Sequence, residues 1–166
     1  YKSLAEKYNV GLLDLNTADV EEVLNGDFLK FEHIMYPNIL KESFIISLPK
    51  LAEDSEIEMS GSLSNMIGAF PASHYKGFFS SGKNKIKKWP AKYAIHDILI
   101  CKMPDFAIID ASVKGVILAG MPLDMDVQAA NLLNKSISYL KLIQESFPEK
   151  PMKKEAAAQP SSPQAQ

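Results

Sequence analysis

The chain has 166 residues, 46% of them hydrophobic, and a formal net charge of −2. A chain of this length can bury about two-thirds of its unfolded surface, which suits one globular domain with a core. Its single cysteine, Cys101, excludes an internal disulfide and any zinc or iron–sulfur site with four cysteine ligands from this chain alone. All 18 basic residues are lysines, so the forked recognition of phosphate or guanine by arginine is excluded, and nucleic acid is not an expected partner.

The first residues, "YKSLAEKYNV" (1–10), are expected to form a helix. No charged-then-apolar leader opens the chain, and no apolar run reaches the roughly 18 residues that span a bilayer. We therefore expect a cytoplasmic protein without a membrane segment. The chain starts without an initiator Met, which favours a fragment over a processed protein.

Three apolar stretches in the first half of the chain are typical of strands. "VGLLDL" (10–15) predicts a short buried strand. "FEHIMYP" (31–37) alternates apolar and polar residues, as a half-exposed strand does, and "SFIISLP" (43–49) carries β-branched isoleucines. Pro49 ends the last of these strands, and the acidic run that follows, 53–58, is expected to face solvent.

The second half of the chain alternates helices and strands. We expect a short helix at 61–70, a helix at 90–103 that starts with proline, strands at 105–110 and 114–120, and a long helix at 122–144. Strands separated by helices predict an α/β fold, with a three-layer, mainly parallel sheet and helices on both faces. In such sheets, ligands bind beyond the C-terminal ends of the strands.

The predicted domain covers residues 1–147, and the segments 10–15 and 43–48 are expected to share one sheet with the two later strands. Residues 148–166, rich in Pro, Ser, Ala and Gln, have little to bury and are expected to form a disordered tail or linker. The basic run "KNKIKK" (83–88) is interpreted as a solvated loop rather than a nucleic-acid or lipid site, because the overall charge is negative.

Two polar residues are expected at the C-terminal ends of neighbouring strands. The ammonium of Lys50 can hold an anion there, although a solvated strand-end lysine is the alternative. Asp110 ends a buried strand and is a candidate for moving protons, although capping of the following turn explains it too. We predict that Lys50, Asp110 and Asn65 converge at one edge of the sheet.

Four further residues have both a functional and a structural interpretation. Asn65 and Gly68 either shape a ligand loop or form an ordinary turn. His74 is an acid, base or ligand candidate, with a surface loop histidine as the alternative. Asp126 is a ligand candidate or a charge in the first turn of its helix. His96 is interpreted as a partly buried helix residue, and no metal site is predicted, because no His-Glu-x-x-His spacing occurs.

Four segments follow one another in the order of a known family: "FIISLPKL", "GSLSNMIGAFP", "PDFAIIDA" and "LAGMPLDMD". They are similar to the motifs of domain-of-unknown-function family 362, an uncharacterised α/β family often fused to ferredoxin-type four-iron modules. The resemblance covers roughly residues 1–135. It implies that Lys50, Asn65, Gly68 and Asp126 occupy motif positions, and that the family's N-terminal portion is missing here.

The chain departs from the family at several polar positions. Lys50 is followed by "LAEDS" where the family has Leu-Lys-Thr-His, and Ser64 stands where the family has a lysine. Met121 replaces an aspartate, and only "ASVK" follows Asp110 in place of a long glycine-rich loop. The site that the resemblance implies is therefore either repurposed or degenerate.

Two functions of different classes remain open, and the sequence leaves undecided whether the chain is an enzyme. The first is an accessory binding or electron-transfer-associated domain beside an iron–sulfur partner or fused module, as the family's fusions imply. The second is an enzyme acting on a small anionic metabolite, with Lys50 steering the anion and Asp110 or His74 moving protons. In both, the chain itself is expected to hold no cofactor.

Overall fold

The structure is a computed structural model that describes residues 1–75 and 90–147. The basic run 83–88 and the segment 148–166, for which the sequence predicts a solvated loop and a tail, lie outside the described residues.

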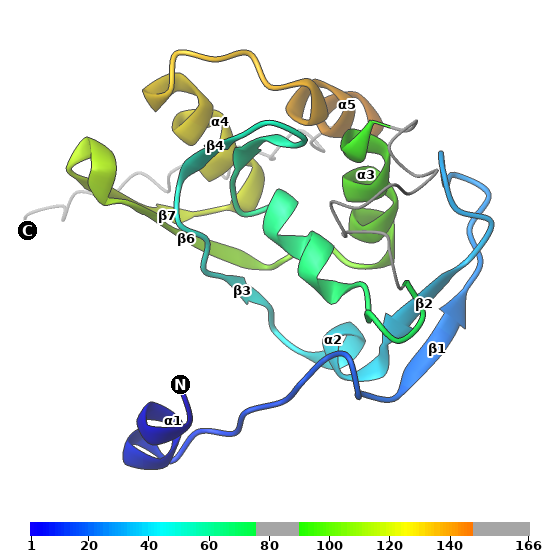
Figure 1. Ribbon diagram of the computed structural model, residues 1–166. Helices are drawn as coiled ribbons and strands as arrows, with labels where there is room; N and C mark the ends of the chain where they lie inside the picture. The colour runs from blue at the N-terminus through cyan, green and yellow to red at the C-terminus, as the bar shows by residue number, and fades with distance from the viewer. Residues whose placement is uncertain (76–89, 148–166) are drawn as a thin grey trace, which may run out of the picture.

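Three strands form the main sheet in the order β3–β6–β7 (Figure 1). They are β3 (Ile46–Ser47), β6 (Phe106–Ala111) and β7 (Val116–Gly120). β3 runs parallel to β6, whereas β7 runs antiparallel to it. β6 and β7 are joined only by the 3-10 turn η3 (Ser112–Lys114) and Gly115, whose φ of 76° favours glycine. So short a connection permits an antiparallel pair and no parallel one.

The expected set of parallel strands is therefore wrong in two places. β7 is antiparallel, and residues 10–15 form no strand. A strand needs a neighbour with which its backbone pairs, and no described strand pairs with this segment. The side chains of Val10, Leu12 and Leu13 are exposed as a result. Helices and strands are nevertheless mixed along the chain, which agrees with the α/β class.

Two small antiparallel hairpins accompany the main sheet. β1 (Val20–Val23) pairs with β2 (Ile34–Pro37), so the strand predicted at 31–37 begins three residues late. β4 (Ala52–Asp54) pairs with β5 (Glu58–Ser60). The second hairpin is closed by a short turn, whereas residues 24–33 connect the strands of the first.

The acidic run lies in the second hairpin and mostly faces solvent, as predicted. Glu53, Asp54 and Glu56 are exposed. Asp54 Oδ1 accepts the backbone N–H groups of Glu56 and Ile57 at 2.7 and 2.9 Å, which closes the turn. These carboxylates therefore stabilise a surface turn.

The helix predicted at 90–103 is confirmed as α3 (Ala91–Cys101), which begins after Pro90. The long helix predicted at 122–144 is instead two helices, α4 (Pro122–Leu132) and α5 (Ser138–Ser146). Asn134, with a positive φ of 52°, lies just after α4, where a left-handed residue is favoured. An apolar pattern that spans the break hid this boundary.

Two short α-helices lie in the first part of the chain. α1 (Lys2–Tyr8) precedes the segment 10–15, and α2 (Asn38–Glu42) follows β2 directly. The carbonyl of Ile39 in α2 accepts the Ser43 hydroxyl at 2.6 Å, and the chain then enters β3. α2 therefore links the first hairpin to the main sheet.

The core lies between one face of the sheet, α4, and the packed pair of α3 and α5. Ala107, Ile109 and Ala111 of β6 alternate onto this inner face and are fully buried. Ile95 and Ile98 of α3 are equally buried. The alternation in β6 thus fixes which of its side chains point away from the core.

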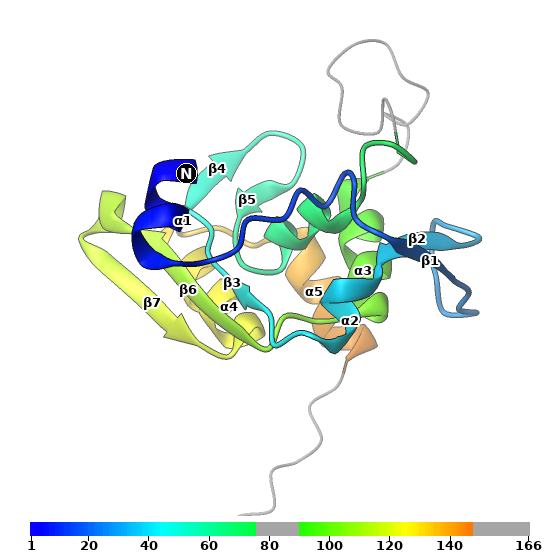
Figure 2. The ribbon, with the colours of Figure 1, turned by 90° about the horizontal axis from the view of Figure 1, so that it is seen from below.

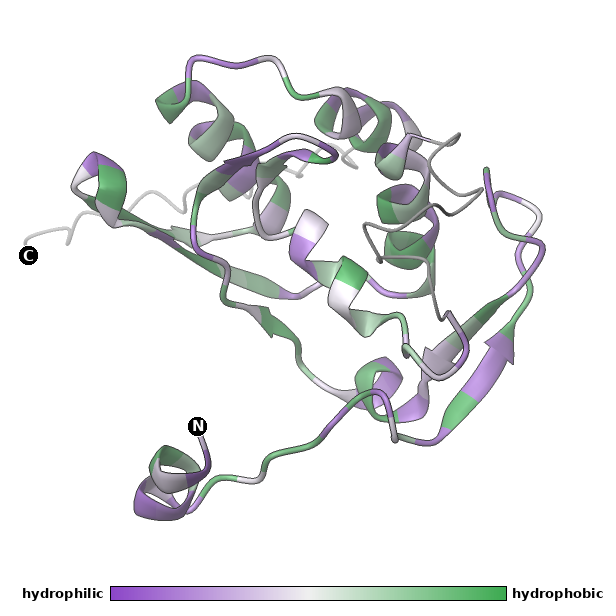
Figure 3. Cartoon of the chain, viewed as in Figure 1, coloured by the Kyte–Doolittle hydropathy of each residue, from purple (hydrophilic) through white to green (hydrophobic). Residues whose placement is uncertain are grey.

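No helix or strand of residues 1–75 and 90–147 covers the opposite face of the sheet. This outer face is defined by Ile46, Leu48, Ile108 and Ile117, which are 48%, 66%, 36% and 70% exposed. The strand register places Ile117 opposite Asp110, on the face that Ile108 shares. Figure 3 shows hydrophobic residues along β3 and β6.

Helix α1 stands on the outer-face side of the sheet but does not cover it. Figure 1 shows α1 apart from β3 and β6, and Figure 2, seen from below, shows α1 in front of the sheet and α4 behind it. Leu4 and Tyr8 of α1 remain 53% and 64% exposed. Both the helix and the sheet therefore present unburied apolar side chains.

Candidate functional site

Lys50 and Asp110 lie side by side at the C-terminal ends of β3 and β6. They form an isolated parallel bridge, in which the Leu51 N–H donates to the Asp110 carbonyl at 2.8 Å. The Asp110 N–H donates to the Pro49 carbonyl at 2.9 Å. Both side chains are exposed and continue the outer face, because bridged residues point to the same side of a sheet. The structure therefore brings this predicted pair together.

The carboxylate of Asp110 is tied to the turn that follows it. Its Oδ1 accepts the Ser112 backbone N–H at 2.9 Å. Hydrogen bonds from Ser112 and, to a smaller extent, the charge of Lys50 lower the pKa of Asp110 below its ordinary value. Asp110 is thus an ionised turn cap, which makes it a weak proton acceptor near neutral pH.

Asn65 and Gly68 lie on the 3-10 helix η1 (Ser64–Ala69). The Asn65 amide donates to the Ser47 hydroxyl at 3.1 Å, and Ser47 is buried on the inner face of β3. This contact directs the amide toward the opposite side of β3 from Lys50. A Cβ at Gly68 would meet nothing within 4 Å, so no close approach requires glycine there.

Asp126 is fully buried on α4 and joins two segments of the chain. Its Oδ1 accepts the Ser62 N–H at 2.5 Å and the Ser62 hydroxyl at 2.7 Å. Its Oδ2 accepts the Leu63 N–H and the Tyr139 hydroxyl, both at 3.0 Å. Burial raises the pKa of Asp126 above its ordinary value, and these hydrogen bonds offset only part of that rise.

These contacts correct the interpretation of Asp126 as a charge in the first turn of its helix. It is the fifth residue of α4, and its oxygens hold the turn at 61–63. Gly61 belongs to that turn, and a Cβ there would lie 2.6 Å from Asp126 Oδ2. The backbone of residue 61 therefore lies so close to the Asp126 carboxylate that only glycine fits there.

His74 is exposed and lies beside the first hairpin. It lines a cavity of about 550 Å³ together with its neighbour Tyr75 and with residues of β2 and the loop before it: Lys30, Phe31, Glu32, His33 and Met35. Neither Lys50 nor Asp110 lines that cavity. The structure gives no sign that His74 joins the pair at the strand ends.

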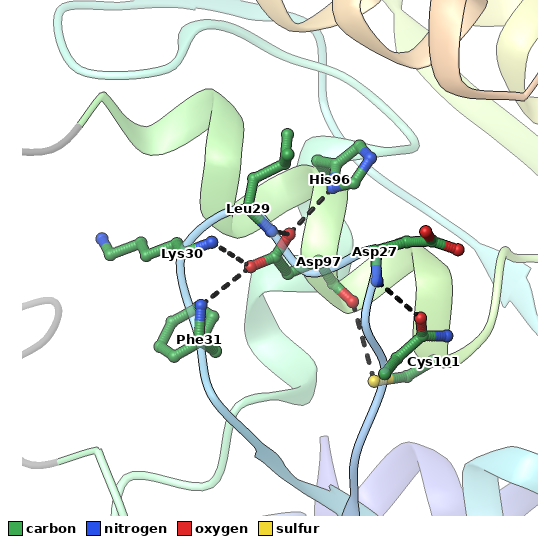
Figure 4. Close-up of polar contacts among 8 residues, drawn as sticks. Asp27, Leu29, Lys30, Phe31, His96, Asp97 and Cys101 are labelled. Carbon is green, nitrogen blue, oxygen red and sulfur yellow. Dashed lines mark hydrogen bonds and ion pairs between the residues drawn. The ribbon is translucent and has the colours of Figure 1, made fainter.

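A second polar cluster, around Asp97 of α3, was not among the sequence candidates (Figure 4). Asp97 is fully buried, and its Oδ1 accepts the Leu29 N–H at 2.8 Å. Its Oδ2 accepts the N–H groups of Lys30 and Phe31 at 2.7 and 3.0 Å. His96 Nδ1 lies 2.8 Å from Asp97 Oδ1.

The sequence contained a signal for this cluster. "AIHDILI" places a histidine and an aspartate inside an apolar stretch of α3. A buried carboxylate is costly unless it is fully hydrogen-bonded, so such an aspartate predicts partners from elsewhere in the chain. Its partners, the backbone groups of residues 29–31, have no side-chain pattern that would reveal them.

The described residues offer no metal centre and no membrane segment. No group of three or more His, Cys, Asp or Glu side chains in 1–75 and 90–147 is placed to hold a metal ion. No helix in these ranges is long and apolar enough to cross a bilayer. Burial raises the pKa of the Cys101 thiol to about 12, so this sulfur is also a poor ligand.

Comparison with known proteins gives one result. Residues 1–129 match the family described as Domain of unknown function (DUF362). No curated protein and no solved structure matches the chain.

Proposed function

We propose that this chain, which belongs to the DUF362 family, is a cytoplasmic accessory domain that packs its outer face against an iron–sulfur partner chain or fused module. Family membership supports the kind of partner, because the resemblance implies ferredoxin-type fusions. The uncovered apolar face of the sheet is the observation that carries the proposal.

The outer face has the properties of an unfilled interface. A pair of parallel strands such as β3 and β6 is normally covered on both faces, and here α4 covers only one. Contiguous apolar surface of more than a few hundred Å² marks interaction sites in soluble proteins. On this proposal, the partner supplies the missing layer, and the assembled sheet then has the three layers that the sequence predicts.

Lys50 and Asp110 lie at the rim of this face. A polar rim around an apolar centre is the usual anatomy of a protein interface. The pair carries opposite charges on neighbouring strands, so it can fix the orientation of a partner without adding much affinity. This role requires no proton transfer by Asp110.

The test is calorimetric titration with a ferredoxin that carries two four-iron clusters. Leu48→Glu places a charge on the outer face and should weaken binding by at least about tenfold. Leu24→Glu is the matched control, since Leu24 is 73% exposed, against 66% for Leu48, but lies just beyond β1. Equal weakening by both variants, or no binding by the unaltered chain, would overturn the proposal.

An enzyme acting on a small anionic metabolite is the second candidate. The exposed ammonium of Lys50 at the strand ends favours it, because ligands of α/β sheets bind there. The lowered pKa of Asp110 and the separate cavity of His74 weigh against proton transfer at this position. Asn65, Gly68 and Asp126 would then support the loop beside the ligand.

Anion binding separates this candidate from the first. Inorganic phosphate and malonate should raise the melting temperature of the unaltered chain, and Lys50→Ala should remove that rise. Lys141→Ala, at another exposed lysine, is the control. Stabilisation that survives in Lys50→Ala would refute a site at the strand ends.

A further inference from the structure

A cavity of about 590 Å³ lies between α3, the loop before β2 and the end of α5. About half of its lining is apolar, from Phe28, Leu29, Ile100 and Phe147, and the polar groups come from Asp27, His96 and Ser146. Cavities of about 300–1,000 Å³ with apolar walls and a few polar groups are typical of small-molecule sites. The lining thus has the composition of a ligand site.

The imidazole of His96 is the buried polar group of this cavity. The residue is only 3% exposed, and its Nδ1 lies 2.8 Å from Asp97 Oδ1. A carboxylate can only accept, so Nδ1 carries a proton. In the neutral ring, Nε2 is then an acceptor, and it lies on the side of the ring away from Asp97 (Figure 4).

Nε2 has no hydrogen-bond partner among the described residues. The buried side-chain atom that the described structure leaves wholly enclosed and unpartnered is the Tyr36 hydroxyl, not this nitrogen. Nε2 therefore opens onto the cavity that His96 lines. A ligand with an O–H or N–H donor can therefore pair with Nε2 in place of solvent.

Asp97 fixes both sides of the cavity at once. Its two oxygens accept three backbone N–H groups, from residues 29–31, as well as the His96 proton. Four donors saturate the carboxylate, so the ring and the loop that carries Phe28 and Leu29 are held in a fixed geometry. A site held in this way needs little ordering when a ligand arrives.

We infer that this cavity binds a small aromatic molecule with an O–H or N–H donor, which His96 Nε2 accepts. The apolar walls contact the ring of the ligand. Asp27 is the charged side chain among the lining residues, so the site favours neutral or cationic ligands and disfavours anions. It is therefore distinct from an anion site at Lys50.

The test uses indole and 1-methylindole, which have nearly the same shape, although only indole has an N–H donor. Nitrogen NMR of the histidine rings at pH 8 should show the Nε2 resonance of His96 shifting as indole is added. Indole should bind about fivefold more tightly than 1-methylindole, the usual effect of one neutral hydrogen bond. The rings of His33 and His74 should not respond.

Two variants test whether the preference for indole over 1-methylindole depends on His96. His96→Phe replaces the imidazole with an apolar ring and removes the acceptor, so both probes should bind this variant equally. His74→Phe, at an exposed histidine outside this cavity, should keep the preference for indole. The inference is overturned if neither probe moves the His96 resonances, if both bind the unaltered chain equally, or if the preference persists in His96→Phe. The NMR result on the unaltered chain decides the question even if His96→Phe fails to fold.

Discussion

Replacement of Gly61 by alanine should destabilise the fold through a single buried clash. The added Cβ would lie 2.6 Å from Asp126 Oδ2 and 2.8 Å from both Oδ1 and Cγ. The carboxylate cannot move aside, because Ser62, Leu63 and Tyr139 hold it with four hydrogen bonds. The turn at 61–63 must therefore shift and lose part of these bonds.

The magnitude follows from the bonds that are lost. Each hydrogen bond to a buried charged group contributes about 1.5–3 kcal/mol. If the shift breaks two of the four, Gly61→Ala should lower the free energy of unfolding by about 3–6 kcal/mol. For a domain of this size that corresponds to a fall in melting temperature of roughly 6–24 °C.

Chemical denaturation followed by circular dichroism measures this loss. Gly68→Ala is the matched control, because a Cβ at Gly68 meets nothing within 4 Å, and it should change stability by less than about 1 kcal/mol. In a chain that also carries Asp126→Ala, the added effect of Gly61→Ala should shrink to less than about 1 kcal/mol. Equal losses for Gly61→Ala and Gly68→Ala, or an undiminished loss in the double variant, would refute the reasoning.

Three further predictions concern single side chains. Tyr36→Phe should raise the free energy of unfolding by about 1 kcal/mol in urea denaturation, because the fully buried Tyr36 hydroxyl has no partner among the described residues; a loss of stability would contradict this. Burial raises the pKa of the Cys101 thiol from 9.0 to about 12, so its alkylation by iodoacetamide at pH 8 should be about a thousandfold slower than that of a free thiol. A rate near that of free cysteine would contradict this prediction. Because the pKa of Asp110 is lowered in the folded chain, its ionised carboxylate stabilises the fold above the ordinary carboxyl pKa of 3.8, and this contribution is lost as the pH falls through the folded-state pKa. In acid titrations, Asp110→Asn should therefore lose less stability below pH 4 than the unaltered chain. The same loss of stability in both would refute the assignment.

The sequence predicted those features of the structure that a local residue pattern determines. Pro90 marks the start of α3, and the apolar run in "DFAIID" predicts the strand that is observed as β6. The apposition of Lys50 and Asp110 followed, because both lie near the C-terminal ends of apolar strands that pair in parallel. Each of these features rests on a pattern within one segment of the chain.

Other features depend on contacts between distant segments. The apolar run 10–15 has the composition of a strand, but no described strand pairs with it. The role of Asp126 arises from residues 62, 63 and 139, and that of Asp97 from the backbone of residues 29–31. Backbone donors leave no mark in a side-chain pattern, so neither cluster could be assigned from the sequence.

Hydrogen–deuterium exchange of the chain with and without a ferredoxin bearing two four-iron clusters tests the proposed interface most directly. Binding through the outer face should slow exchange of amides in residues 44–48 and 106–110, which carry Ile46, Leu48 and Ile108, and leave those of the β1–β2 hairpin unchanged. Protection confined to that hairpin, or no protection anywhere at saturating ferredoxin, would contradict a role for this face.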